Sequence, residues 1–252
     1  MTFPKISIIT VTYNSAKTLR DTLESVQSQK YKNIEHIVID GNSGDETHKI
    51  IKNYPSVKFI SEKDDGIYDA MNKGIKHASG DIVGFLNADD FFNDKECIGL
   101  IATEFLNDRK VDIVFGNIIL VSSSNVNKIV RFKKSKPYSQ KAIFNGWMAP
   151  HPTLYVKTEK LNKLNGFNTK YKIQADFELM IRLFEVEKLN SKYINKTLVR
   201  MRLGGASTKI SNIIAGNIEA SDACKINGYS GGIRFIIRKI MSRLPEFFLK
   251  HK

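Results

Sequence analysis

Short apolar stretches alternate with amphipathic ones along the first ninety residues, and this alternation limits the fold more than any other feature of the sequence. Residues 6–12, 34–39, 57–60 and 82–86 are rich in β-branched and apolar side chains, which is typical of buried strands. Helices are predicted between them at residues 16–26, 46–53 and 66–78. Because the connections are short, the pattern predicts an α/β fold with a mainly parallel, doubly wound sheet.

Polar residues follow three of the predicted strands at the point where each strand ends. They are Thr12-Tyr13-Asn14, the run from Asp40 to Ser43, and Asp89-Asp90. Ligands of such sheets bind beyond the carboxyl ends of the strands, so we expect a site there. Two adjacent carboxylates are costly to bury without a neutralising partner, and oxygen ligands suit Mg²⁺ or Mn²⁺. A capping turn before the next helix is the structural alternative for Asp89 and Asp90.

Several common classes of protein lack their signatures in this chain. No G-x-G-x-x-G, no G-K-[ST] phosphate loop and no G-x-S-x-G occurs. Cys97 and Cys224 stand far apart without a C-x-x-C, so we expect two unpaired thiols in a reducing compartment. No apolar run approaches the roughly 20 residues that span a membrane. We therefore expect a cytoplasmic protein and leave peripheral attachment to the plasma membrane open.

Charge is divided unevenly along the sequence. Residues 1–127 hold 14 Lys/Arg and 18 Asp/Glu, whereas the whole chain has a net charge of +13, so residues 128–252 carry +17. The basic stretches Lys128–Lys141 and Lys225–Lys252 hold much of this charge. Nucleic acid, anionic lipid and a diphosphate substrate are candidate partners, and a solvated surface is the alternative. Nucleic acid is disfavoured, because no motif for it occurs and the acidic strand ends repel phosphate without a metal.

The second half of the chain is less regular. Residues 111–121 are predicted to form a strand, 122–141 a loop or hairpin, and 174–184 a helix with Asp176 in its first turn. From Ile233 onward, Ile233, Ile236, Ile237, Ile240, Met241 and Leu244 fall on one helical face among basic residues. This tail either lies on an anionic membrane or packs against the rest of the protein. His151, Trp147 and the Arg200/Arg202 pair are further candidates for ligand contacts, with loop or core roles as the alternatives.

Five blocks of sequence resemble family 2 of the GT-A glycosyltransferases, in the family's order and spacing. They are SIITVTYN at residues 7–14, IDGNSGDET at 39–47, DGIYDAMNKG at 65–74, SGDIVGFLNADD at 79–90 and QADFELMIRL at 174–183. The resemblance implies a GT-A fold with one catalytic domain over residues 1–220. Residues 1–120 would bind the nucleotide sugar, residues 121–220 the acceptor, and residues 221–252 would form the basic amphipathic segment.

The resemblance also implies roles for individual residues. Asp176 would be the general base, and Asp89 and Asp90 would hold Mn²⁺ or Mg²⁺ against the diphosphate of the donor. No motif offers a second nucleophile, so a single displacement that inverts the anomeric centre is expected. The residues expected to line the nucleotide pocket are Thr12, Tyr13, Asn14, Asp40, Asp65, Asn72 and Asp89.

Two positions depart from the family pattern. Gly41 stands where many relatives have a second acid, which leaves UDP-, GDP- and dTDP-sugars open, with a UDP-sugar expected first. Asn87 opens the D-x-D position, so Asp89 and Asp90 are left to hold the metal. The implied acceptor is a saccharide, carried on polyprenyl diphosphate in capsule, exopolysaccharide or O-antigen assembly. The alternative hypothesis is a non-catalytic module on the same scaffold that recruits a membrane complex.

Overall fold

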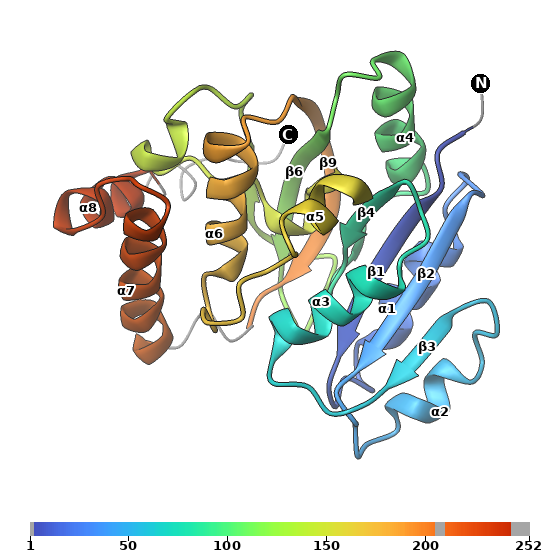
Figure 1. The fold of residues 1–252 in the computed structure, drawn as a ribbon. Helices are drawn as coiled ribbons and strands as arrows, with labels where there is room; N and C mark the ends of the chain where they lie inside the picture. The colour runs from blue at the N-terminus through green and yellow to red at the C-terminus, as the bar shows by residue number, and fades with distance from the viewer. Residues whose placement is uncertain (1–2, 205–209, 243–252) are drawn as a thin grey trace.

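The computed structural model describes residues 3–204 and 210–242, which form a nine-stranded sheet with helices on both faces. The strand order is β3-β2-β1-β4-β8-β6-β9-β5, and β7 pairs with β6. Figure 1 shows α3, α5 and α6 on the face of the sheet toward the viewer, with the N-terminus and α8 at opposite sides of the molecule. The α/β architecture expected from the sequence is confirmed.

The first half of the chain forms the parallel part of the sheet. Strand β1 pairs in parallel with β2 and β4, and β2 pairs in parallel with β3. The elements are β1 (Ile6–Thr12), α1 (Leu19–Gln27), β2 (Ile34–Asp40), α2 (Thr47–Ile51), β3 (Lys58–Ser61), α3 (Ile67–His77) and β4 (Ile82–Phe85). The register places Thr12 beside Asp40 and Asp40 beside Ser61, so three strand ends lie at one edge.

The second half of the chain adds antiparallel pairs to the sheet. Strand β8 is antiparallel to both β4 and β6, while β9 is parallel to β6 and antiparallel to β5. The predicted hairpin at residues 122–141 forms, with β7 antiparallel to β6. The strands are β5 (Phe91–Phe92), β6 (Ile113–Val121), β7 (Ile129–Lys133), β8 (Tyr155–Lys157) and β9 (Ser191–Arg202). The helices are α4 (Cys97–Asn107), α5 (Thr158–Lys163), α6 (Ala175–Met180), α7 (Ile210–Ile226) and α8 (Ile233–Met241).

The core lies on both faces of the sheet because side chains alternate along each strand. On β1, Ile9 and Val11 pack with α3 and α6 residues, whereas Ile6 and Ile8 face the α4 side. All four side chains are buried. Burying an isoleucine stabilises the fold by about 1.5–3 kcal/mol, so this strand anchors both layers.

The C-terminal helices α7 and α8 lie together beside α6 (Figure 1). The amphipathic helix predicted from Ile233 is present as α8, while Leu244 and the rest of the predicted tail to residue 252 lie outside the described residues. Cys97 and Cys224 are free and buried, as expected. Within residues 3–204 and 210–242, no helix combines the length and the apolar character needed to cross a membrane.

Candidate active site

The loops after β1 and β2 are joined by side-chain hydrogen bonds at the carboxyl edge of the sheet. The backbone N–H of Asn14 donates to Oγ of Ser43 at 2.8 Å, and the N–H of Gly44 donates to Oδ1 of Asn14 at 2.9 Å. Asn14 has a φ of 49°, a left-handed conformation that asparagine tolerates. The two loops therefore form one rigid wall, and Asn14 is a structural part of it.

Asp40 lies at the predicted strand end, but its carboxylate is enclosed by the loop. Oδ2 accepts hydrogen bonds from Nε2 of His48 and Oγ of Ser61, both at 2.7 Å, and from the N–H of Ser43 at 3.0 Å. Burial raises the pKa of Asp40, but the hydrogen bonds outweigh burial and hold it below its usual value. Asp40 thus fixes the loop, and its fully buried side chain presents no free oxygen to solvent.

Tyr13 and Asp64 approach each other over Gly41. The ring of Tyr13 is 65% exposed. A Cβ on Gly41 would stand 2.5 Å from Oδ2 of Asp64 and 3.4 Å from Cδ2 of Tyr13, so a larger residue there would displace the Asp64 carboxylate from its present position. The carboxylate of Asp64, from the loop between β3 and α3, therefore lies beside Gly41, the position where many relatives have a second acid.

Asp64 was not predicted as a site residue, whereas Asp65 and Thr12 were. The carboxylate of Asp65 is exposed, and its carbonyl oxygen accepts a hydrogen bond from Nζ of Lys172 at 3.1 Å. Thr12 is buried at the end of β1, and its hydroxyl has no hydrogen-bond partner among the described residues. The sequence did hold a hint of this role. Gly41 lacks the second acid found in many relatives, and Asp64, next to Asp65, is an acid to which no role had been given.

The turn after β4 brings Asp89 and Asp90 together. Asp90 is almost fully buried; its Oδ1 accepts a hydrogen bond from the N–H of Arg202 at 3.2 Å, and its Oδ2 has no partner within the described chain. Burial and the nearby Asp89 raise the pKa of Asp90 well above its usual value. Burial also raises the pKa of Asp89, which remains partly exposed.

These two carboxylates fit a divalent cation that takes its other ligands from a substrate. The described residues hold no cluster of three or more His, Cys, Asp or Glu side chains with metal-binding geometry. Mg²⁺ and Mn²⁺ sites that bind phosphates often use only one or two carboxylates. The orphan oxygen of Asp90 and the partly exposed carboxylate of Asp89 agree with such a site, and Asp89 is the better placed for a ligand arriving from solvent.

The side chains of Arg200 and Arg202, considered above for ligand contacts, bind other groups of the protein. Both belong to β9, where Nε of Arg200 donates to Oδ1 of Asn93 at 3.1 Å. The guanidinium of Arg202 is buried, pairs with Asp21 and donates to the carbonyl oxygen of Asp89. Arg202 therefore supports the turn at Asp89 and Asp90 through its backbone N–H and its guanidinium.

Asp176 lies in the first turn of α6 and contacts the first turn of α3. Its Oδ1 accepts hydrogen bonds from the N–H of Phe177 at 2.8 Å and from the hydroxyl of Tyr68 at 3.2 Å. The single proton of the Tyr68 hydroxyl is shared between Asp176 and the carbonyl oxygen of Ile173, which lies at 2.9 Å. Burial and Asp176 raise the pKa of Tyr68 well above its usual value, so the hydroxyl stays a donor.

His151 connects Asp176 to the strand that carries the acidic turn. Its ring stacks on Phe85, the last residue of β4, at 5.4 Å, and meets Phe167 edge-on at 5.6 Å. Nε2 of His151 is buried and has no hydrogen-bond partner in the described structure. Burial lowers the pKa of His151, and the charge of Asp176 partly opposes this shift. His151 thus packs on the last residue of the strand that precedes the acidic turn, and its ring senses the charge of Asp176.

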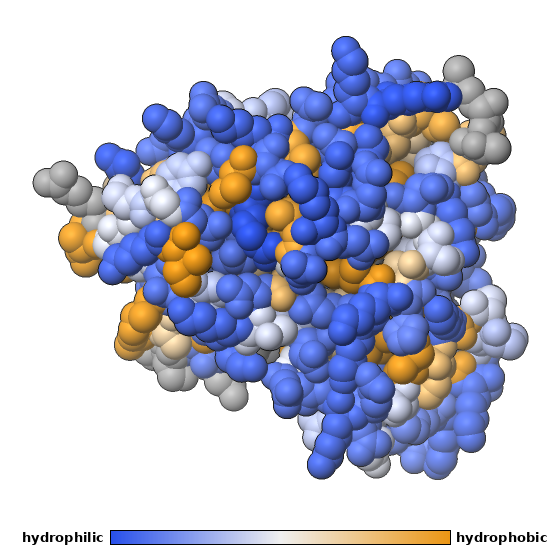
Figure 2. Space-filling view, viewed as in Figure 1, coloured by the Kyte–Doolittle hydropathy of each residue, from blue (hydrophilic) through white to orange (hydrophobic). Residues whose placement is uncertain are grey.

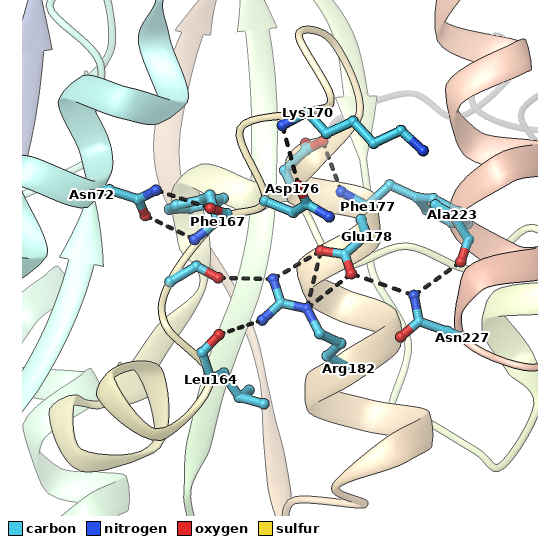
Figure 3. Close-up of polar contacts among 12 residues, drawn as sticks. Asn72, Leu164, Phe167, Lys170, Asp176, Phe177, Glu178, Arg182, Ala223 and Asn227 are labelled. Atoms are coloured by element: carbon cyan, nitrogen blue, oxygen red, sulfur yellow. Dashed lines mark hydrogen bonds and ion pairs between the residues drawn. The ribbon is translucent and has the colours of Figure 1, made fainter. Parts of the chain in front are cut away.

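Asn72, expected at the border of the pocket, uses both ends of its side-chain amide within the protein. Its Nδ2 donates to the carbonyl oxygen of Phe167 at 2.9 Å, and its Oδ1 accepts from the N–H of Phe167 at 2.8 Å (Figure 3). The amide is therefore used to hold the segment before α6 against α3. Trp147 is partly buried and packs edge-on against Phe115 and Phe184 at the border of the core.

An ion pair inside the protein fixes the helix that carries Asp176. Nε and Nη2 of Arg182 bind both carboxylate oxygens of Glu178 at 2.8–3.0 Å, and the guanidinium also donates to the carbonyl oxygens of Leu164 and Gly166 (Figure 3). Asn227, directly after the end of α7, donates to Oε1 of Glu178 at 3.3 Å. Both charged side chains are largely buried, so α6, α7 and the preceding loop are held as one unit.

The sequence is similar to those of known glycosyltransferases. The sequence model described as "Glycosyl transferase family 2" matches residues 7–167. An uncharacterized glycosyltransferase of Mycobacterium tuberculosis is 33% identical over 184 residues, covering 71% of this chain and 68% of the relative. A PGL/p-HBAD biosynthesis glycosyltransferase of Mycobacterium bovis is 27% identical and covers 83% of this chain and 82% of its own length.

Solved structures share the fold. Residues 1–349 of TarS from S. aureus align over 98% of this chain and 75% of that chain, with 21% identity and a TM-score of 0.72, and the same protein has been solved with UDP-GlcNAc and with UDP. The mannosyltransferase PcManGT of Pyrobaculum calidifontis, solved with GDP-Man and Mn²⁺, aligns over 95% of this chain and 69% of that chain, with 17% identity and a TM-score of 0.64. The observed fold is the GT-A fold.

Proposed function

Since this chain belongs to glycosyl transferase family 2, we propose that it transfers a sugar from a nucleoside diphosphate to a hydroxyl group in one inverting step. The observation that supports this most directly is the contact of Asp176 with Tyr68. It joins a carboxylate of the second half of the chain to α3, which begins immediately after Asp64 and Asp65. This contact supports a base and a nucleotide site that serve one substrate.

Asp176 is the general base of the proposed reaction. As the acceptor oxygen attacks the anomeric carbon, its proton passes to Oδ2 of Asp176, because Oδ1 already accepts two hydrogen bonds. The bond from the anomeric carbon to the diphosphate breaks in the same step. A divalent cation at Asp89, when bound, stabilises the charge on the departing diphosphate. The Mn²⁺ complex of PcManGT supports this assignment of a metal.

The donor is proposed to be a UDP-sugar. Tyr13 offers an exposed ring for stacking on a base, and Asp64 offers a carboxylate acceptor beside it. The imide N–H of uracil is a donor that pairs with such a carboxylate. The complexes of TarS with UDP-GlcNAc and UDP support the same choice. Thr12, Asn14 and Asp40 would then shape the pocket, and Asp65 would line its rim.

The acceptor is proposed to be a lipid-linked saccharide in surface polysaccharide assembly at the inner face of the plasma membrane. The mycobacterial relatives named for PGL/p-HBAD biosynthesis support a glycan of the cell surface. The net charge of +17 on residues 128–252 agrees with an anionic substrate or surface.

Isothermal titration calorimetry with UDP, GDP and dTDP, each with and without Mn²⁺, tests this proposal. We expect UDP to bind in the presence of Mn²⁺. In Asp89→Asn, the gain in UDP affinity that Mn²⁺ gives should be lost. Asp176→Asn is expected to keep nucleotide affinity and to lose transfer from the matching donor. A wild-type protein that binds no nucleotide with metal would refute the proposal. Retained biological activity of Asp176→Asn would favour the recruiting module instead.

A further inference from the structure

The C-terminal helices present a row of exposed isoleucines that the rest of the described structure does not cover. On α8, Ile233, Ile237, Ile240 and Met241 follow the i, i+4, i+7, i+8 spacing of one helical face and are 52–70% exposed. On α7, Ile214 and Ile218 are 60% and 65% exposed. In Figure 2, apolar patches lie over these two helices at the left of the molecule. We call these six side chains the α7–α8 apolar face.

The acidic residues of the two helices are each engaged by groups of the segment before α6, although the side chain of Asp222 remains 41% exposed. Oxygens of Glu219 accept hydrogen bonds from the N–H groups of Lys172, Ile173 and Gln174 at 2.8–3.0 Å. Asp222 pairs with Nζ of Lys170 and the hydroxyl of Tyr171, both at 2.9 Å. Residues 210–242 contain no other acid.

Basic residues flank the same face. Lys225 and Arg238 are exposed near the ends of α7 and α8. Exposed isoleucines bordered by cations, without an uncompensated carboxylate, match the interfacial region of an anionic bilayer. A protein partner would have to supply both an apolar groove and acids, whereas anionic lipid supplies both chemistries at once.

The opposite side of α8 packs on the helix that carries Asp176. Phe235 packs against Phe177 with ring centroids 5.6 Å apart. Nζ of Lys239 donates to Oε1 of Gln174 at 3.0 Å and lies 5.3 Å from the ring centre of Phe177. Gln174 and Phe177 flank Asp176 in the sequence, so α8 has one side on the candidate active site and the other in solvent.

We propose that the α7–α8 apolar face docks on an anionic lipid surface and so presents the Asp176 side of the active site to acceptors held in that surface. The docking itself requires only the helices, while its purpose rests on the proposed glycosyltransferase function. The face inserts its isoleucines among the acyl chains, with Lys225 and Arg238 at the phosphate level. The acceptor hydroxyl then reaches Asp176 without release of its lipid anchor.

Co-sedimentation with sucrose-loaded vesicles tests the docking. One set contains phosphatidylcholine alone, and the other contains about one third phosphatidylglycerol. We expect the full chain to bind the anionic vesicles and to leave the neutral ones largely unbound. Ile237→Gln/Ile240→Gln should lower the partition coefficient roughly tenfold or more, since two half-exposed apolar side chains no longer enter the bilayer. Arg238→Glu should weaken binding to the anionic set alone.

Matched control variants lie at the other side of the protein. Phe3→Gln removes an apolar side chain that is 65% exposed, and Lys52→Glu reverses an exposed charge directly after α2. Both should bind vesicles as the wild type does. Equal binding by the Ile237/Ile240 variant, with its circular dichroism unchanged, would overturn the proposal. So would a wild-type dimer in solution that this variant splits, because the face would then be a contact between copies.

Nucleotide calorimetry on the same variants separates the two proposals. The Ile237→Gln/Ile240→Gln protein should bind UDP with Mn²⁺ as tightly as the wild type, and should lose transfer only to vesicle-borne acceptors. Vesicle binding without nucleotide binding by the wild type would contradict the proposed function and leave the docking surface standing. Nucleotide binding without vesicle binding would contradict the docking alone.

Discussion

The hydroxyl of Tyr68 donates a hydrogen bond to Oδ1 of Asp176 at 3.2 Å, across 108 positions of the sequence. This bond ties the first turn of α3 to the first turn of α6. It leaves Oδ2 of Asp176 as the oxygen that is free to accept a proton.

Replacing Tyr68 with phenylalanine should lower kcat with little change in KM for the donor. The ring and its packing on Phe167 remain, so only the orientation of Asp176 is loosened. One lost hydrogen bond to a carboxylate predicts a roughly tenfold effect. Steady-state kinetics would check it. An unchanged kcat, or an increase in KM alone, would contradict the positioning role of Tyr68.

Replacing Asp64 with asparagine should weaken UDP binding roughly tenfold, because an amide accepts the imide N–H less strongly than a carboxylate does. Gly41→Ala should have a similar effect, since its Cβ would collide with Oδ2 of Asp64. Calorimetry with UDP is the measurement. Glu62→Gln is the control, because it removes an exposed neighbouring carboxylate that pairs with Lys73. Equal UDP affinity in Asp64→Asn would exclude Asp64 from the base pocket.

Replacing Arg182 with methionine should destabilise the protein by about 3–5 kcal/mol, because it leaves the buried carboxylate of Glu178 without its ion pair. The double variant Arg182→Met/Glu178→Leu should recover much of this loss. Urea denaturation followed by circular dichroism measures both. If the double variant were as unstable as the single one, the bonds from Arg182 to Leu164 and Gly166 would carry the stability instead.

Glu35 should make folding stability fall in acid. Burial raises its pKa, but hydrogen bonds from Ser7 and Ser79 outweigh burial and lower the pKa to about 2. The unfolded value is about 4.3, so the contribution is complete above that pH and is lost as the pH falls toward 2. Glu35→Gln should flatten the stability curve in this window. Chemical denaturation at several pH values is the check, and parallel curves for the two proteins would refute the assignment.

His36 should act in a separate, higher window. Burial lowers its pKa to about 4, and its Nε2 lies 3.0 Å from the hydroxyl oxygen of Thr10. The unfolded chain takes up this proton near pH 6.5, before the folded chain does, so stability falls as the pH drops from 6.5 to 4. His36→Gln should remove this slope while leaving the Glu35 window in place. Persistence of the slope in the variant would show that another group causes it.

The first half of the fold could be predicted because its strands are continuous apolar runs with turn residues at their ends. Strand β9 could not be, since its sequence SKYINKTLVRMR mixes charged and apolar side chains. Its position beside β6 depends on pairing over long separations in sequence, which no local pattern encodes. The antiparallel pairing of β8 with β4 and β6 could not be predicted for the same reason.

The candidate site shows a similar division. The strand ends at Thr12, Asp40 and Asp89 follow from the topology, and the structure brings them to one edge. What each side chain does there depends on its neighbours. The amide of Asn72 is used by Phe167, the carboxylate of Asp40 is enclosed by Ser43, His48 and Ser61, and Asp64 fills the space above Gly41. These partners come from distant segments, so only the folded chain identifies them.

The bond from the N–H of Arg202 to Asp90 has a consequence for the order of events during synthesis. Asp90 leaves the ribosome 112 residues before its partner does. Pairing over so long a separation is slow, because the chain entropy must be lost before the contact forms. A nascent chain of one hundred residues could therefore assemble β1 to β4 and their loops while its acidic turn still lacked its support. The acidic turn is therefore supported only after β9 has been synthesised, when nearly the whole sheet has been made.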